Sequence, residues 1–392
     1  MRILFVTGGS PATVFALAPL ATSLRNLGHA VLMAANEELM TSVAAVGIPA
    51  VPTVTPGIQH YVWTGPDGTS TPVPREPEPA MRHMGASFAR MGAESLAPLA
   101  ALCRDWRPEV VVGGAFAYAA PFLAADLGVP YVRHTWDAVD LSGVDEGATA
   151  ELAGELARRD LAALPVPALL IDICPPSLRV EDPAGRRPGP ARVAAMRWIP
   201  GNRQRRLEPW MYARGPHRNR VLVTSGTRAF MPDTVGSLLR LTAELTDRDA
   251  EVLLAAPEDV AEGLRGELGA DVRAGWLPLD VVAPTCDLII HHGGGVTAMT
   301  ALNAGVPQLV TPKGAYLVAA CRPIADAGAA VLLAPGQDAA EDTVKACEAM
   351  LADESYRRSA RDLATTIAAL PPPPELAHAV VALATPSKEE SG

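Results

Sequence analysis

The stretch of residues 286–302 constrains the fold of this chain more than any other. Residues 288–290 have the length and β-branched content of a buried strand, three glycines at 293–295 then break it, and residues 296–302 continue as a helix. This order leaves free backbone N–H groups at a helix N-terminus, and glycine lets an anion approach them closely. We therefore expect a site for a diphosphate, to which His292 donates a further hydrogen bond. The spacing matches neither the dinucleotide-binding nor the P-loop glycine pattern.

Strand-like runs alternate with helical patterns along the whole chain. Such alternation predicts parallel, doubly wound sheets, and the runs fall into two series separated by a break. We therefore expect an α/β fold with two Rossmann-like domains that face each other across a cleft, with ligands beyond the carboxyl ends of the strands. The predicted strands lie near residues 2–7, 30–34, 49–53, 109–113, 130–133 and 167–173, and near 220–225, 250–255, 270–274, 286–291, 307–311 and 329–333.

Length and composition suggest where the domains end. A chain of 392 residues is too long for one ordinary core, so we expect two domains of roughly 180 residues. Residues 183–219 are rich in proline, glycine and arginine, a composition that does not build a core. The four consecutive prolines at 371–374 mark a second break, at the end of the second domain. The predicted parts are an N-terminal domain, a linker, a C-terminal domain and a final helix with its tail, at residues 1–199, 200–219, 220–370 and 371–392.

Charge and cysteine content exclude several functions. A net charge of −10, from 43 acidic against 33 basic residues, argues against binding to nucleic acid or to an anionic membrane. Five scattered cysteines without a C-x-x-C pair suggest neither a disulfide framework nor a zinc site. The apolar stretch 109–132 contains glycines, a proline and an aspartate, and therefore reads as strand, helix and strand rather than as a membrane span. The apolar run at the start of the chain is too short for the core of a signal peptide, so we expect a cytoplasmic protein.

Three blocks in fixed order carry a resemblance to a known family. They are Gly-Trp-Leu-Pro-Leu-Asp at 275–280, His-His-Gly-Gly-Gly at 291–295 and Ala-Gly-Val-Pro-Gln at 304–308. Together they resemble the donor-binding signature of the bacterial antibiotic glycosyltransferases, GT-B proteins that use nucleotide sugars. The resemblance implies that the second domain binds the donor and the first domain the acceptor, that the C-terminal helix returns to the first domain, and that neither a metal nor a cofactor is needed.

The resemblance also assigns donor-binding residues. The nucleobase is expected against Trp276 and Leu277, where the indole offers a stacking face, and the alternative is that Trp276 packs in a core. Ser225 and Thr227 follow a predicted strand and offer hydroxyl and N–H groups to phosphate, unless they form only an ordinary capped turn. The diphosphate itself is expected at the glycine turn and the first helical turn, formed by His292, Gly293, Gly294, Gly295, Val296 and Thr297.

The first domain departs from the family at the catalytic base. Relatives carry a histidine just inside the first helix, whereas Thr13 stands there in this chain and cannot act as a base. Asp137, after the strand at 130–133 and beside Trp136, could take over this role, because a partly apolar setting raises a carboxyl pKa. Asp137 could instead cap the next turn or pair with an arginine, and His134 is the second candidate. Ser10 caps the first helix and could also contact a ligand.

Further segments narrow the resemblance to transferases that decorate aromatic polyketides with deoxysugars. Residues 10–20, 135–140, 171–177 and 207–212 are similar to the angucycline-type C-glycosyltransferases that attach D-olivose, a group in which an aspartate at the position of Asp137 is implicated as the base. Many sugar-binding relatives carry an Asp-Gln pair where this chain has Tyr316 and Leu317. The loss of two polar groups fits a donor that lacks hydroxyls, so a TDP-2,6-dideoxyhexose is expected.

These expectations combine into one mechanism. Asp137 removes a phenolic proton from an aromatic polyketide, and the phenolate attacks the anomeric carbon from the face opposite TDP, with inversion and without a metal. A C-glycosidic bond is expected, and O-glycosylation is the alternative. The acceptor is expected to contact aromatic side chains of residues 55–95 together with Trp136, although the same side chains could form a satellite core. The residues assigned to it are His60, Tyr61, Trp63, Phe88 and Trp136.

Two other classes of protein remain open. A nucleotide-sugar epimerase with the same fold needs no acceptor, but it needs acid–base groups around the sugar, and Tyr316 and Leu317 supply few. A non-catalytic helper that stabilises a partner transferase needs no intact donor site, whereas the glycine turn is intact. A homodimer is the assembly that we expect if the chain associates with itself.

Overall fold

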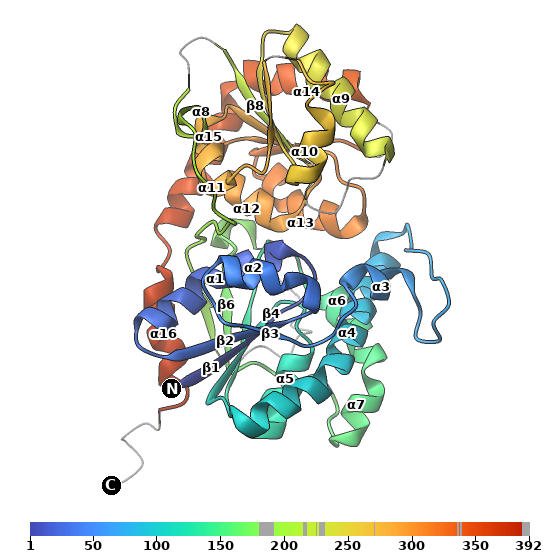
Figure 1. The fold of residues 1–392 in the computed structure, drawn as a ribbon, viewed down its shortest axis with the longest axis vertical. Helices are drawn as coiled ribbons and strands as arrows, with labels where there is room; N and C mark the ends of the chain where they lie inside the picture. Colours follow the sequence, from blue (N-terminus) through green and yellow to red (C-terminus); the bar gives the residue numbers. More distant parts are fainter. Residues whose placement is uncertain are drawn as a thin grey trace.

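The computed structural model describes residues 1–179, 192–214, 218–224, 226, 232–269, 271–334, 337 and 339–385. These residues form two lobes stacked along the long axis of the molecule (Figure 1), each built on a parallel sheet. We call the lobe with the seven-stranded sheet the first lobe and the lobe with the six-stranded sheet the second lobe. This is the two-domain α/β architecture that the alternating pattern predicts.

The sheet of the first lobe has the strand order β3-β2-β1-β4-β5-β6-β7, and every neighbouring pair is parallel. Its central strands are mostly apolar because helices cover both faces of the sheet. The strands are β1 (Arg2–Val6), β2 (Ala30–Ala35), β3 (Ala50–Pro52), β4 (Val110–Gly114), β5 (Tyr131–His134), β6 (Leu169–Asp172) and β7 (Val193–Ala195). The helices are α1 (Pro11–Asn26), η1 (Glu37–Leu39), α2 (Met40–Ala45), α3 (Ile58–Trp63), α4 (Pro77–Asp105), α5 (Ala119–Leu127), α6 (Ser142–Glu151), α7 (Ala153–Arg158) and η2 (Pro176–Leu178).

The sheet of the second lobe has the order β10-β9-β8-β11-β12-β13 and is also parallel. Its strands are β8 (Arg220–Thr224), β9 (Glu251–Ala255), β10 (Val272–Gly275), β11 (Leu288–His291), β12 (Gln308–Val310) and β13 (Ala330–Leu332). Its helices, including the short ones that lead into it, are α8 (Pro209–Tyr212), α9 (Pro232–Asp247), α10 (Glu258–Leu264), α11 (Leu279–Val282), η3 (Ala283–Thr285), α12 (Gly295–Asn303), α13 (Ala315–Asp326), α14 (Ala340–Ala352) and α15 (Glu354–Ala368).

Every strand predicted from the sequence is present, and one further strand was not predicted. β7 lies within the stretch 183–219, and Leu170 of β6 is its register partner at Val193. The prediction that this whole stretch builds no core is wrong, because Met196 and Trp198 are fully buried in the first lobe. Met211, in the same stretch, is buried in a core cluster with residues of the second lobe. The abundance of proline and arginine hid these core side chains and a three-residue edge strand, since so short an element leaves no periodic pattern.

Helix α16 (Pro373–Ala382) follows the second lobe in sequence but packs against α1 of the first lobe (Figure 1). The backbone N–H of Arg197 donates to the carbonyl of Pro371 at 2.8 Å, so the two connections between the lobes touch each other. The chain therefore crosses between the lobes twice.

Helices α4 and α6 cross at two glycines. A Cβ on Gly85 would lie 1.8 Å from the carbonyl oxygen of Val144, and a Cβ on Gly147 would lie 2.0 Å from that of Arg82. Only glycine permits so close a backbone approach. The crossing fixes the distance between α4 and the segment that joins β5 to α6, and both border the cleft between the lobes.

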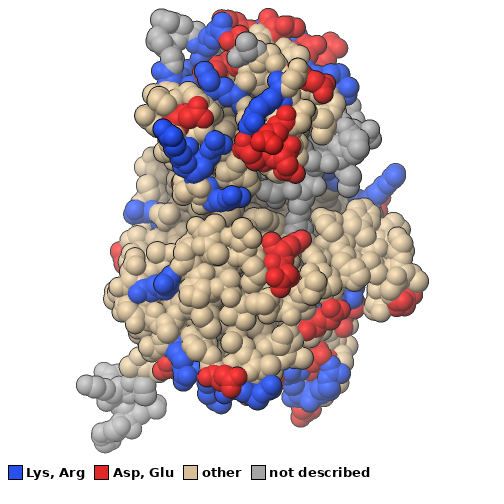
Figure 2. Space-filling view, in the orientation of Figure 1, with Lys and Arg blue, Asp and Glu red and all other residues tan. Residues whose placement is uncertain are grey.

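Within the described ranges no helix combines the length and the apolar character that a membrane crossing requires. Figure 2 shows acidic and basic side chains interspersed over the second lobe and at the outer end of the first lobe. The face of the first lobe next to the cleft carries few of them in this view. The face drawn in Figure 2 thus carries no continuous patch of one charge sign among the described residues.

Candidate active site

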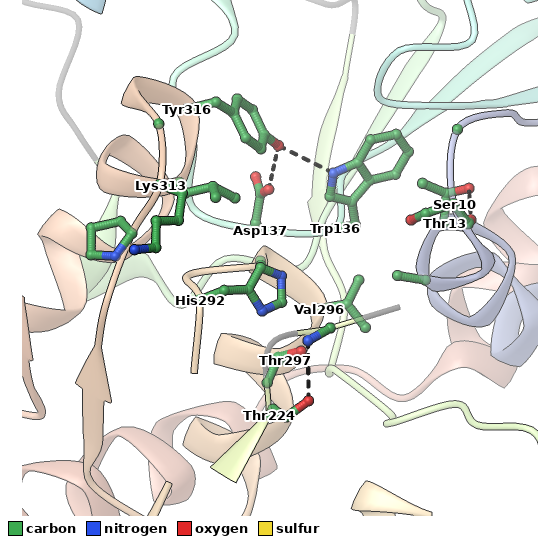
Figure 3. A pocket seen from close by; sticks show the side chains of 18 of the residues that line it. Ser10, Thr13, Trp136, Asp137, Thr224, His292, Val296, Thr297, Lys313 and Tyr316 are labelled. Atoms are coloured by element: carbon green, nitrogen blue, oxygen red, sulfur yellow. Dashed lines mark hydrogen bonds between the residues drawn. The ribbon is translucent and has the colours of Figure 1, made fainter. Parts of the chain in front are cut away.

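A cavity of about 1270 Å³ lies between the carboxyl ends of the two sheets, and side chains from both lobes point into it (Figure 3). Its position follows from the topology, because parallel strands place the loops that follow them at one edge of each sheet. From the first lobe it is lined by the loop after β1, the segment after β5 and apolar side chains of α3 and α4. From the second lobe it is lined by the segments that follow β8, β9, β10, β11 and β12, and by α13.

Asp137 lines the cavity from the first lobe and is 5% exposed. Its Oδ1 accepts a hydrogen bond from the backbone N–H of Val139 at 3.1 Å, and its Oδ2 accepts one from the hydroxyl of Tyr316. Burial raises the pKa of the carboxyl to about 6, and the hydrogen bonds from Tyr316 and Val139 only partly oppose this shift. A carboxylate with such a pKa can accept a proton near neutral pH.

Aromatic rings surround Asp137. The ring of Phe116 packs against Phe88, Trp136 and Tyr316, with centroid distances of 4.9, 5.0 and 5.5 Å. The indole N–H of Trp136 donates to the hydroxyl oxygen of Tyr316 at 3.3 Å. These rings exclude water from the carboxylate and supply the apolar setting that raises its pKa.

Ser10 and Thr13 line the cavity at the start of α1. Thr13 Oγ1 donates to the carbonyls of Gly8 and Ser10, at 3.1 and 2.9 Å, so it closes the first turn and has no role as a base. Ser10 is the N-cap residue, as predicted, but its side chain makes no capping hydrogen bond. The hydroxyl of Ser10 is therefore available to a ligand.

His134 is fully buried and does not line the cavity. Its Nδ1 lies 2.5 Å from the carbonyl oxygen of Thr135, and desolvation lowers its pKa to about 4. A histidine that stays neutral and has no access to the cavity cannot exchange a proton with a substrate there. Of Asp137 and His134, only Asp137 can thus serve as the base.

The glycine turn has the predicted geometry. β11 ends at His291, Gly293 has a φ of +95°, Gly294 is the N-cap, and α12 begins at Gly295. Because Gly294 has no side chain, no side chain caps the first N–H groups of this nine-residue helix. Gly294 and Gly295 line the cavity together with Val296 and Thr297, whereas Gly293 lies behind it and provides the left-handed turn. The helix N-terminus therefore faces the cavity and suits an anion.

The imidazole of His292 lies between two glycines of different loops. A Cβ on Gly226 would lie 2.4 Å from its Cε1, and a Cβ on Gly294 would lie 2.7 Å from its Nε2. Its Nδ1 is buried without a hydrogen-bond partner. Desolvation lowers the pKa to about 4, although the nearby backbone of Thr224 opposes the shift. His292 is therefore neutral at pH 7 and offers a hydrogen bond rather than a positive charge.

Trp276 and Leu277 line the far end of the cavity, beyond β10. The indole N–H of Trp276 donates to the carbonyl of Arg203 at 2.9 Å. The backbone N–H of Trp276 donates to Glu258, and its carbonyl accepts from Arg205, so both main-chain groups of Trp276 are occupied. One hydrogen bond thus holds the ring and two hold the main chain of Trp276, and Leu277 is left to offer main-chain groups to a ligand.

Three residues assigned to the acceptor do not line the cavity. His60 is exposed, Trp63 is 51% exposed and bonded to Gln59, and Tyr61 is buried and donates to Glu94 at 2.6 Å. The residues of α3 that do line it are Ile58, Gln59 and Val62. The sequence pointed to the correct helix but to the wrong face, because a helix turns by about 100° per residue. Phe88 and Trp136 line the cavity as expected, whereas Ser225 and Thr227 lie outside the described residues.

Phe116 and Asn202 are among the lining residues that the sequence analysis missed. Phe116 follows β4 and lines the cavity, although the rule that placed Asp137 there applies equally to this strand. Asn202, in the predicted linker, lines the cavity and donates to Asp280 at 3.1 Å.

Asp137 is the only acidic residue among the described residues that line the cavity, and the described chain contains no group of three metal-ligating side chains.

Comparison with known proteins places the chain in a family. Residues 22–226 match the N-terminal domain, and residues 239–383 the C-terminal domain, of erythromycin biosynthesis protein CIII-like proteins. The chain is 33% identical to the L-demethylnoviosyl transferase of Streptomyces niveus over 97% of this chain and 98% of that protein. It is 30% identical to the elloramycin glycosyltransferase ElmGT of Streptomyces olivaceus over 96% of each chain.

Solved structures agree with this assignment. Glycosyltransferase SsfS6 of Streptomyces sp. SF2575, in complex with thymidine diphosphate, has a TM-score of 0.86 and 31% identity over 97% of this chain and 99% of that chain. SnogD of Streptomyces nogalater has a TM-score of 0.77 and 30% identity over 98% and 99%. The chain therefore belongs to the erythromycin biosynthesis protein CIII-like family of antibiotic-biosynthesis GT-B glycosyltransferases.

Proposed function

We propose that this glycosyltransferase moves a 2,6-dideoxyhexose, of the D-olivose type, from a TDP-sugar to an aromatic polyketide, with inversion at the anomeric carbon. The observation that carries the proposal is the position of Asp137. Its side chain lies against Gly295, the first residue of the helix whose N-terminus would hold the donor diphosphate. A base from the first lobe and an anion site from the second lobe thus meet in one cavity, as transfer between two bound substrates requires.

The donor side supports a TDP-deoxysugar. The solved relative SsfS6 binds thymidine diphosphate, and the solved rhamnosyltransferase SpnG was also captured with it. Pro312, Tyr316 and Leu317 line the cavity next to the glycine turn, where a sugar attached to the diphosphate would lie. These side chains offer few partners for sugar hydroxyls, so a deoxysugar leaves fewer of its own polar groups unpaired.

The acceptor side supports a flat apolar molecule. The first lobe contributes the side chains of Ile58, Val62, Val73, Ala80, Met84, Phe88, Phe116 and Trp136. Rings and aliphatic side chains of this kind bury an aromatic surface well, and a flat polycycle loses little conformational entropy on binding. Elloramycin glycosyltransferase is a relative at 30% identity, which fits a polyketide-type acceptor.

The mechanism follows from these positions. Asp137 accepts the proton of a phenol, and the resulting phenolate attacks the anomeric carbon through its oxygen or through the ortho carbon. The bond between the anomeric carbon and the diphosphate breaks, and the first turn of α12 and the imidazole of His292 stabilise the charge that leaves. With Asp137 as the only carboxylate among the described lining residues, the cavity lacks the cluster of oxygen ligands that a divalent cation prefers. We therefore propose a metal-independent reaction.

The most specific part of the proposal is the bond that joins the sugar to the acceptor. We propose a C-glycosidic bond, which requires that the pocket hold a ring carbon rather than the oxygen about 3–3.5 Å from the anomeric carbon. The test is to incubate the enzyme with TDP-olivose and a panel of anthraquinone, angucycline and tetracycline aglycones. A product that resists acid and shows cross-ring cleavage of the sugar by mass spectrometry supports the C–C bond. A product that acid splits into free sugar and intact aglycone replaces it with O-glycosylation.

The same assay separates the other classes of protein. Release of TDP only when an aromatic acceptor is present supports transfer. An altered TDP-sugar without TDP release would identify an epimerase. A protein that neither binds TDP by calorimetry nor releases it would instead be a non-catalytic helper.

A further inference from the structure

The carboxylate of Asp137 and the phenol of Tyr316 come from different lobes and point toward each other (Figure 3). Tyr316 lies in the first turn of α13, and its hydroxyl donates to Oδ2 of Asp137 at 2.5 Å. The indole N–H of Trp136 donates to the same hydroxyl oxygen. This arrangement holds the phenol between the base and the aromatic wall of the cavity.

The two oxygens of Asp137 are not equivalent. Oδ1 is occupied by the backbone N–H of Val139, which belongs to the same loop and fixes the carboxylate in place. Oδ2 accepts instead from a side chain of the other lobe, the phenol of Tyr316. Oδ2 is also the oxygen that lies against Gly295 at the start of α12. An acceptor hydroxyl that attacks a sugar held there and gives its proton to Asp137 therefore competes with Tyr316 for Oδ2.

Tyr316 can donate in this contact but cannot supply an anion. Desolvation and the neighbouring Asp137 raise its pKa well above the ordinary value, so the phenol keeps its proton at any working pH. It therefore resembles the phenolic acceptor of the proposed reaction in shape and in hydrogen bonding, but it cannot replace it as a nucleophile.

We propose that Tyr316 is a positioning residue that covers the base. Its hydroxyl occupies Oδ2 of Asp137 until an acceptor hydroxyl displaces it, and in this way it keeps water from binding to Oδ2. The inference rests on the proposed role of Asp137. Under this proposal the second lobe not only binds the donor but also favours the acceptor over water at the base.

The reaction that Tyr316 suppresses is hydrolysis of the donor. If water reached Oδ2, Asp137 would take a proton from it, and the water oxygen would bond to the anomeric carbon. The bond from that carbon to the diphosphate would break. Free sugar, TDP and one proton would be the products, at the expense of a costly activated sugar.

The test compares wild type, Tyr316→Phe and a matched control, Tyr118→Phe. Tyr118 also donates a phenolic hydrogen bond to a carboxylate, that of Asp145 at 2.7 Å, but it does not line the cavity. Its removal leaves Asp145 bonded to Arg133. Each protein is given TDP-olivose with and without an aromatic acceptor, and TDP and free sugar are quantified. TDP affinity by calorimetry confirms that each variant is folded.

We expect Tyr316→Phe to release TDP and free sugar without acceptor about tenfold faster than wild type, because a hydrogen bond to a charged group is lost and water takes its place. Tyr118→Phe should match wild type. A second variant, Trp136→Phe, removes the N–H that holds the phenol and should raise hydrolysis by a smaller factor. Unchanged hydrolysis in Tyr316→Phe, with TDP affinity retained, overturns the inference.

The pH profiles provide an independent readout. The profile of kcat/KM for the acceptor reports the enzyme before acceptor binds, whereas that of kcat reports the full complex. Loss of the phenol removes a hydrogen bond that stabilises the carboxylate, so the acidic limb of kcat/KM should move to higher pH while that of kcat stays. A shift of both limbs would mean that Tyr316 stays on Asp137 during transfer, which contradicts displacement. Failure of wild type to transfer sugar at all would instead overturn the proposed function.

Discussion

The side chain of Asp137 rests on the backbone of Gly295, although the two residues belong to different lobes. A Cβ built on Gly295 would lie 2.4 Å from Cβ of Asp137 and 2.5 Å from its Oδ2. The contact brings the candidate base to the first residue of α12, where free N–H groups face the cavity. Glycine at this position is therefore required for a steric reason as well as for anion binding.

Gly295→Ala should lower kcat about 10²-fold, because the added methyl group must displace the base or separate the lobes, and a shift of about 1 Å costs that much. Steady-state kinetics with a saturating donor measures the effect. Gly263→Ala in α10 is the control, since a Cβ there has open space around it. A rate within twofold of wild type for Gly295→Ala would show that the contact is not kept in the reacting complex.

Asp137→Ala should reduce transfer by about 10²–10⁴-fold, the usual contribution of a general base. TDP affinity should stay unchanged, because the residue belongs to the wall of the first lobe and carries no donor group for the nucleotide. Single-turnover transfer and calorimetry measure the two quantities. A variant that keeps more than about a tenth of the wild-type rate would remove Asp137 from the mechanism.

The acidic limb of the transfer rate should reflect the raised pKa of Asp137. The carboxylate form is the active one, so kcat/KM for the acceptor should be constant above the pKa of about 6 and fall tenfold per pH unit below it. An exposed aspartate would keep its activity down to about pH 4. A profile that stays flat from pH 8 to pH 4.5 would contradict a buried carboxylate as the base.

The same pKa implies a cost in stability. The folded-state value of about 6 exceeds the ordinary 3.8, so the carboxyl favours folding when protonated and opposes it when ionised. The destabilisation is absent below pH 3.8, grows up to pH 6 and is complete above it. At about 1.36 kcal/mol per unit, Asp137→Asn should stabilise the protein by up to about 3 kcal/mol at pH 8. Thermal unfolding at pH 8 and pH 5 tests this, and an equal gain at both values would point to another cause.

His292→Ala should weaken TDP binding by about 10–100-fold and slow transfer, because a donor aimed at the diphosphate is lost. His292 is neutral, so His292→Gln, which keeps a neutral N–H donor, should restore part of the affinity. His378→Ala in α16, an exposed position outside the cavity, is the control. Unchanged affinity and rate in His292→Ala would assign the imidazole to packing between Gly226 and Gly294.

The sequence was sufficient to predict those elements whose own residues show a clear strand, turn or helix pattern. The run before the glycine turn is β-branched, and the three consecutive glycines Gly293 to Gly295 favour a turn, so β11, the turn and α12 follow from a few adjacent residues. Asp137 was located by the same kind of rule, because it follows a strand of a parallel sheet. β7 was missed because three edge residues carry no period.

The sequence by itself determined the two-sheet α/β fold, the glycine turn and the segment that holds the candidate base, because these depend on periodicity and on residues close together in the chain. Only the tertiary structure decided which face of α3 lines the cavity, since His60, Tyr61 and Val62 share one short helix. It alone placed Tyr316 on Asp137 and Asp137 on Gly295. Those contacts join residues more than 150 positions apart, and they depend on how two lobes pack, which no local pattern encodes.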